Sequence, residues 1–184
     1  MKKALPILLT AMILVGCSSP TVMNGDKKVP LESYNGANFS FKYPGDLTLT
    51  SNTNMVAGFG ASLSGVEGYQ PATNLSSASI QIASDDSAAM CEDVNIQAFG
   101  GKQGNPSTVS IAGTDFKKQF YQDAGAGQRE DSIVYTAVNN KKCYKMALVM
   151  QYSVVENSDG KLKKFDQLKL EKVFQVVADS FIFN

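Results

Sequence analysis

Apolar and polar residues alternate in several short runs along the chain, with the period of two that is typical of half-buried β-strands. In the clearest run, 38–44, aromatic and polar residues alternate until Pro44 ends the pattern. The same pattern predicts strands at 38–44, 47–50, 55–59, 78–83, 108–111, 116–121, 132–138 and 143–152. Turn residues predict hairpins at 112–115, 123–130 and 139–142, which would join the last four strands into an antiparallel meander.

The apolar period changes near the C-terminus. From Leu170 the apolar residues recur at the three- and four-residue spacings of a helix, with lysine and glutamate on the other face. This predicts a helix over 164–179, followed by a short extended tail at 182–183. Because an amphipathic helix must bury its apolar face, the sequence predicts an α+β fold, in which an antiparallel sheet of about six to seven strands is covered by the C-terminal α-helix.

Two regions lack a clear strand period. Residues 51–77 are rich in glycine, serine and asparagine and are too long for an ordinary connection between strands. Since long loops often carry binding residues, this segment is the leading candidate region for a site. Residues 100–106 are predicted to be a loop and residues 87–93 a helical turn.

The first residues resemble a bacterial lipoprotein signal. Two lysines precede an apolar run from Ala4 to Val15, which is shorter than the roughly 20 residues that span a bilayer. The Leu-Val-Gly-Cys sequence at 14–17 resembles the lipobox, in which the cysteine is lipidated before cleavage. The resemblance implies that residues 1–16 are removed as a signal peptide and that Cys17 becomes a lipid-bearing N-terminus on a membrane.

Residues 17–33 combine serine, proline, threonine, asparagine and lysine with little periodic apolar content, which predicts a lipidated flexible tether. Residues 34–184 then form a single domain of about 150 residues, because this length suits one core. In a host with two membranes, Ser18-Ser19 lacks the aspartate of the inner-membrane retention signal in enteric bacteria, so we expect outer-membrane attachment facing the periplasm. In a host with one membrane the domain would face outward.

Charge and cysteine content narrow the partners and the compartment. The chain has 17 basic and 17 acidic residues without a basic cluster, so no nucleic-acid partner is expected. With Cys17 assigned to lipid, Cys91 and Cys143 remain as a pair in an oxidising compartment. A disulfide between them would be worth on the order of 4 kcal/mol. The alternative is a pair of buried free thiols.

The absence of histidine limits the chemistry of the protein. It removes Ser-His-Asp and Cys-His catalysis, histidine-ligated zinc and the usual general base near neutral pH. A Ser-Lys dyad remains formally open, but the abundance of both residues makes a pairing meaningless without geometry. We expect a protein that is not an enzyme and has no cofactor.

Four carboxylates near Cys91 are candidate binding residues: Asp85, Asp86, Glu92 and Asp93. Carboxylate and carbonyl oxygens are the ligands of calcium, but the spacing does not match an EF-hand loop, which favours a solvated acidic loop and no metal site. A disulfide at Cys91 would make this loop a rigid contact surface.

Arg129 is the only arginine and a further candidate binding residue. It ends the glycine-containing segment 123–129, which lacks the spacing of a phosphate-binding loop. Its guanidinium could bind a ligand carboxylate through two parallel hydrogen bonds. Alternatively, it pairs with Glu130 or Asp131 on the surface.

Aromatic residues are frequent in the N-terminal third: Tyr34, Phe39, Phe41, Tyr43, Phe59 and Tyr69. They could line a groove for a small ligand, although the alternation at 39–43 favours packing in the core.

The motifs at 39–47, at 109–116 and at 174–181 together resemble the PsbP-like (Mog1/PsbP) superfamily. Family members often carry a tryptophan after the proline turn, where this chain has Leu47. The resemblance implies an antiparallel sheet with flanking helices, and members that mostly bind partners or assist assembly. We therefore expect a membrane-anchored, non-enzymatic envelope lipoprotein that binds a protein partner or assists envelope assembly. A small-ligand binder that uses the aromatic groove and the loop 51–77 is the alternative.

Overall fold

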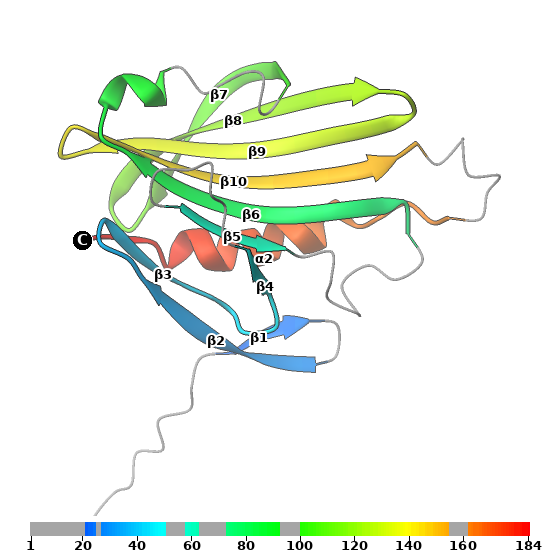
Figure 1. Cartoon of the computed structure of the whole chain (residues 1–184), viewed down its shortest axis with the longest axis horizontal. Helices are drawn as coiled ribbons and strands as arrows, with labels where there is room; N and C mark the ends of the chain where they lie inside the picture. Colours follow the sequence, from blue (N-terminus) through cyan, green and yellow to red (C-terminus); the bar gives the residue numbers. More distant parts are fainter. Residues whose placement is uncertain (1–20, 25–26, 51–57, 63–72, 93–99, 155–161) are drawn as a thin grey trace, which may run out of the picture.

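The computed structural model describes residues 21–24, 27–50, 58–62, 73–92, 100–154 and 162–184 (Figure 1). These residues form a seven-stranded and a four-stranded antiparallel sheet together with a C-terminal α-helix. The predicted α+β class is therefore confirmed. The division of the strands between two sheets was not predicted.

Strand β10 lies at the centre of the larger sheet, whose strand order is β4-β5-β6-β10-β9-β8-β7. The strands are β4 (Thr48–Thr50), β5 (Gly58–Ser62), β6 (Leu75–Asp85), β7 (Gly101–Ile111), β8 (Thr114–Gly125), β9 (Gln128–Asn139) and β10 (Lys142–Ser153). The five residues 146–150 of β10 are all buried, so this strand is covered on both faces. In β6, by contrast, buried and half-buried residues alternate as the sequence predicts.

Two-residue turns connect the four strands β7 to β10. Their turn residues, Ala112-Gly113, Ala126-Gly127 and Asn140-Lys141, have φ angles between 49° and 79°. Positive φ at both positions is the mark of a type I′ turn, whose twist matches that of the flanking strands. The predicted hairpins are thus confirmed. The predicted turn at 123–130 is shorter than expected, because its strands continue to Gly125 and restart at Gln128.

The smaller sheet joins the two ends of the domain. Its strand order is β1-β2-β3-β11, with β1 (Thr21–Asn24), β2 (Lys27–Asn35), β3 (Phe39–Pro44) and β11 (Ile182–Phe183). The predicted C-terminal tail is β11, which pairs with β3 through Ile182 to Ser40 and Phe183 to Phe39.

The helix α2 (Gln167–Asp179) begins later than the predicted residue 164 because Asp166 caps it. The Asp166 side chain accepts a hydrogen bond from the backbone N–H of Lys169 at 3.2 Å. The buried face is the predicted one and contains Leu170, Val173, Phe174, Val177 and Ala178. This face packs against β3 of the smaller sheet and β10 of the larger sheet.

Aromatic rings join the two sheets in one core. The rings of Phe39 and Phe181 stack at 5.6 Å between centroids, and Tyr144 of β10 approaches them at 6.5 and 6.2 Å. Phe41 and Tyr43 are buried in the same cluster. The predicted role of residues 39–43 in the core is confirmed.

Strands β1 and β2 replace most of the tether predicted at 17–33. Val29 is only 2% exposed, and the C=O of Pro30 accepts a hydrogen bond from the N–H of Gly45 at 2.9 Å. The segment resembles a linker in composition because most of its strand residues carry polar side chains. The folded part of the chain therefore begins by Thr21, and residues 17–20 lie outside the described residues.

Two further predictions need correction. The loop predicted at 100–106 is wrong, since β7 begins at Gly101. A register shift between Gln103 and Ser107 accommodates Pro106 on this edge strand, because proline has no N–H to donate to the ladder. The sequence suggests that the strand predicted at 47–50 follows 38–44 across a tight turn, but the structure pairs this strand, β4, with β5 of the seven-stranded sheet. Residues 51–57 and 63–72 of the predicted excursion lie outside the described residues.

Replacement of Val29 tests whether the segment predicted as a tether belongs to the fold. We expect Val29→Ala to lower the free energy of unfolding by about 2 kcal/mol, since it removes buried apolar groups and leaves a cavity. The neighbouring Lys28 is exposed, so Lys28→Ala should change stability by less than about 0.5 kcal/mol. Equilibrium denaturation measures both. If both substitutions changed the free energy of unfolding by the same negligible amount, this segment would not be folded against the domain.

Candidate functional site

The predicted site residues lie at opposite ends of strand β10. Asp85 pairs with Cys143 near the start of this strand, whereas Arg129 pairs with Tyr152 near its end. At about 3.3 Å per residue, the two pairs are separated by about 30 Å. The structure therefore does not combine the acidic residues and Arg129 in one site.

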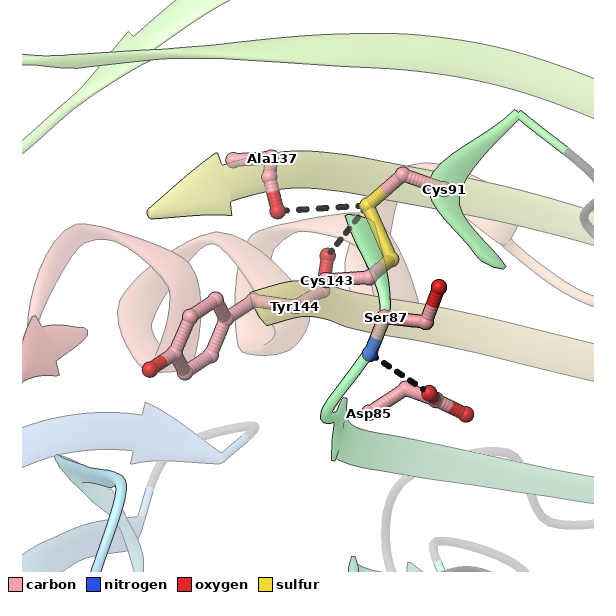
Figure 2. Close-up of a disulfide and its surroundings, with 6 residues drawn as sticks. All are labelled: Asp85, Ser87, Cys91, Ala137, Cys143 and Tyr144. Atoms are coloured by element: carbon pink, nitrogen blue, oxygen red, sulfur yellow. Dashed lines mark hydrogen bonds between the residues drawn. A yellow bond between two sulfur atoms is a disulfide. The ribbon is translucent and has the colours of Figure 1, made fainter. Parts of the chain in front are cut away.

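A disulfide between Cys91 and Cys143 holds the first of these ends (Figure 2). The two Cα atoms are 5.3 Å apart, and both residues are buried. The bond fixes the 3-10 turn η1 (Ala88–Cys91) against β9 and β10, and Cys91 Sγ lies 3.2 Å from the carbonyl oxygen of Ala137. The predicted disulfide and helical turn are both confirmed, and the alternative of free thiols is not.

The acidic residues at the disulfide end make contacts within the protein. Asp86 forms an ion pair with Lys142 at 3.0 Å, and Lys142 also donates a hydrogen bond to Asn38 at 3.1 Å. Asp85 accepts a hydrogen bond from the backbone N–H of Ser87 at 3.0 Å (Figure 2). These contacts tie η1 and β10 to the turn between β2 and β3, so Asp85 and Asp86 have structural roles.

The remaining acidic candidates give no metal site in the part of the chain that the structure describes. Glu92 is exposed directly after η1, and Asp93 lies outside the described residues. Among the described side chains, no group of three or more histidine, cysteine, aspartate or glutamate residues could hold a metal ion.

The aromatic candidates belong to the core wherever their side chains are described. Phe39, Phe41 and Tyr43 are buried, and Tyr34 stacks on Phe41 with 5.1 Å between ring centroids. The side chains of Phe59 and Tyr69 lie outside the described residues. The described rings therefore fill the interior and do not line a groove.

Two open clefts, of about 390 and 300 Å³, lie beside the β8–β9 hairpin. Asp123, Ala124 and Arg129 line both of them. Glutamine side chains and the acidic residues Glu130 and Asp131 supply much of the remaining lining. We call the two clefts together the Arg129 cleft, and most of the residues that line them have polar side chains.

The strand register explains how Arg129 reaches the cleft. It is the second residue of β9 and pairs with Ala124 of β8 and with Tyr152 of β10. Strand alternation puts Arg129, Asp131 and Tyr152 on one face. The Tyr152 hydroxyl donates a hydrogen bond to Asp131 at 2.9 Å, and Asp131 also accepts one from Gln122 at 3.1 Å.

Burial raises the pKa of the Tyr152 phenol above its ordinary value, and the hydrogen bond to Asp131 and the charge of that carboxylate raise it further. Arg129 opposes these effects through its own charge and a hydrogen bond to the phenol. At neutral pH Tyr152 is therefore a neutral donor that holds Asp131 in place.

The carboxylates around Arg129 are held by other partners. Glu130 accepts a hydrogen bond from Gln151 at 2.7 Å, and Asp123 accepts one from the backbone N–H of Ala124 at 2.8 Å. No carboxylate in the described part of the chain lies within ion-pair distance of the guanidinium. The predicted alternative of an ion pair with Glu130 or Asp131 is not observed. The positive charge thus stays available to a partner, as the candidate role of Arg129 requires.

Sequence reasoning found Arg129 but missed most of the residues around it. Gln122 and Asp123 come from β8, and Gln151 and Tyr152 come from β10, so only the register of both strands with β9 brings them beside Arg129. The signal that could have found them is the two-residue turn at Ala126-Gly127, which fixes that register.

No protein-family model and no curated protein matches the chain, but solved structures do. They include the Ran-binding protein Mog1p of Saccharomyces cerevisiae (10% identity, 84% of this chain and 95% of that chain, TM-score 0.49). They also include LpqN, involved in cell envelope biogenesis of Mycobacterium tuberculosis (14% identity, 90% of each chain, TM-score 0.47). A Bacteroides thetaiotaomicron protein matches at 11% identity and a TM-score of 0.45, over 79% of this chain and 45% of that chain. We draw no conclusion about family or function at these identities and TM-scores.

Removal of the disulfide tests its contribution to the fold. We expect the Cys91→Ala/Cys143→Ala double variant to lose up to about 4 kcal/mol of unfolding free energy, because the bond restricts the unfolded chain. Lys142→Met, which breaks the neighbouring half-exposed ion pair, should cost less than about 1 kcal/mol. Denaturant unfolding compares the two variants. A double variant as stable as the parent would contradict a structural role for the bond.

Proposed function

We propose that the protein is a membrane-anchored envelope lipoprotein of non-enzymatic type that binds a protein partner through the Arg129 cleft. The observation that supports the site most directly is the guanidinium of Arg129, which lines an open polar cleft without an ion pair among the described residues. The rest of the proposal concerns location and the absence of catalysis.

The location rests on the lipoprotein signal at residues 1–17 and on the disulfide. A disulfide such as Cys91–Cys143 is typical of oxidising compartments outside the bacterial cytoplasm. In a host with two membranes, the residues after Cys17 favour attachment to the outer membrane, with the domain in the periplasm. The described helices include none long and apolar enough to span a bilayer.

The chemistry of the cleft favours a partner that presents one carboxylate beside hydrogen-bond donors. The guanidinium can bind a carboxylate through two parallel hydrogen bonds. Asp123 lines both clefts with Arg129, Glu130 lines one and Asp131 the other, so a strongly anionic ligand would be repelled while ammonium, amide or hydroxyl donors would be accepted. An exposed carboxylate next to a lysine or an amide on a protein surface presents this combination of one carboxylate and neighbouring hydrogen-bond donors.

A small ligand is the second candidate occupant, since 390 Å³ is within the range of small-molecule sites. Such sites are lined mainly by apolar and aromatic residues, whereas the Arg129 cleft is open, and the described residues that line it have mostly polar side chains and no aromatic ring. A rim of this kind is more typical of a protein interface. Since the chain contains no histidine, we propose binding and not catalysis.

Arg129→Gln tests the cleft in the intact, membrane-bound protein. Photocrosslinking in cells should recover a reproducible protein partner with the parent, and at least tenfold less of it with Arg129→Gln, because a buried charge-assisted contact is lost. The matched control is Lys117→Gln, which removes one positive charge from an exposed position of β8 that does not line the cleft.

The Arg129→Lys variant separates geometry from charge, since lysine keeps the charge and loses the planar fork. We expect it to bind less than the parent and more than Arg129→Gln. Equal recovery with all variants would contradict the role of the cleft, and recovery of no reproducible partner would contradict the proposed function. Unchanged unfolding curves would show that the variants are folded.

Cys17→Ser tests the anchor separately. Without the thiol no thioether lipid can form, so the variant should leave the membrane fraction and lose incorporation of labelled palmitate. Ser18→Ala is the control and should stay membrane-bound. A Cys17→Ser protein that still sediments with membranes and carries lipid would contradict lipidation at this residue.

A further inference from the structure

The proposed lipid anchor is very close to the first strand. Only residues 18–20 separate Cys17 from Thr21, where β1 begins. A trans peptide chain spans at most about 3.5 Å per residue, so the link between these two Cα atoms is no longer than about 14 Å. The tether predicted from composition, which ends at residue 33, would reach several times further.

The strand at the end of this link is fixed to the domain. Thr21 pairs with Pro30 of β2, and the neighbouring Leu31 pairs with Pro44 of β3. The hydrogen bond from Gly45 N–H to Pro30 C=O, at 2.9 Å, closes the same corner. Movement of Thr21 relative to the domain is therefore restricted by β-ladder contacts on both strands.

The link is also short compared with the domain. A domain of about 160 residues has a radius of gyration of about 15 Å, which corresponds to a diameter of about 40 Å. A link of about 14 Å cannot reach around such a body, so the side on which β1 lies must face the membrane.

We infer that the β1–β2 hairpin (Thr21–Asn24 and Lys27–Asn35) lies against the lipid headgroups, and that the Arg129 cleft is held away from the membrane. Figure 1 shows β7, β8 and β9 on the side of the molecule opposite β1 and β2. This orientation rests on the proposed lipidation of Cys17. It restricts the partner to a protein that reaches the cleft from the aqueous compartment.

The surface of the hairpin fits a headgroup layer. Among the hairpin side chains that the structure describes, Val29 is buried and the exposed ones are Thr21, Lys28, Pro30, Glu32, Ser33 and Asn35. This exposed set contains one cation, one carboxylate, one amide and hydroxyl groups, but no large apolar side chain that would enter the hydrocarbon. The hairpin therefore rests on the membrane surface, and the acyl chains at Cys17 supply the affinity.

Energy transfer from the protein to the membrane tests this orientation. The lipidated protein is placed in phosphatidylethanolamine–phosphatidylglycerol vesicles that carry a headgroup acceptor dye. One donor dye is attached to Lys28→Cys, Ala126→Cys or Asn140→Cys, which are all exposed positions, with the native disulfide kept oxidised. We expect the transfer efficiency at position 126 to be less than half that at position 28, because most of a domain diameter of about 40 Å separates them.

A longer link provides the control. Insertion of 20 glycine and serine residues between Pro20 and Thr21 gives a flexible reach of about 27 Å, which should reduce the difference between positions 28 and 126. Vesicle attachment that is lost in Cys17→Ser establishes the anchor independently. Attachment with equal transfer at the three positions would overturn the orientation alone. Absence of Cys17-dependent attachment would overturn both the orientation and the proposed anchor.

Discussion

The aromatic contacts between the two sheets are the interaction on which the rest of the structure depends. Phe39 of β3 and Phe181, which follows α2, pack together against Tyr144 of the central strand β10. Segments from both ends of the domain thus meet on the best-buried strand. This packing holds the smaller sheet, and the β1–β2 hairpin at its edge, against the body of the molecule.

The two ends of β10 have different roles because their charged groups have different partners. At the disulfide end, Asp86 is paired with Lys142, so charge is used to hold the fold. At the other end, the carboxylates are occupied by glutamine, tyrosine and backbone donors, and Arg129 keeps its charge unpaired. The proposed function follows from this asymmetry, since an unpaired cation in a cleft can contribute to recognition while a paired one is already satisfied.

Residues with a strong period were predictable from the sequence. The alternation at 38–44 and the helical stripe from Leu170 follow directly from burial of one face, and both elements are present. The β1–β2 hairpin was missed because polar side chains conceal a strand whose stability comes from pairing with β3. The neighbours of Arg129 were missed for a related reason, because register across three strands cannot be read from any one of them. The link between Cys17 and the folded domain is much shorter than composition suggests for the same reason, because β1 and β2 form through pairing between strands and not through a local apolar pattern.

The folded domain begins at β1, and with the proposed lipidation of Cys17 this would place a fixed side of the protein on the membrane. Hydrogen exchange of the lipidated protein in vesicles tests it most directly. We expect the amides of β1 and of residues 27–29, which pair with it, to exchange slowly, with protection comparable to that of β3. Exchange of residues 21–30 at the rate of an unstructured peptide would contradict it, because the anchor would then be joined to the domain by a long flexible tether.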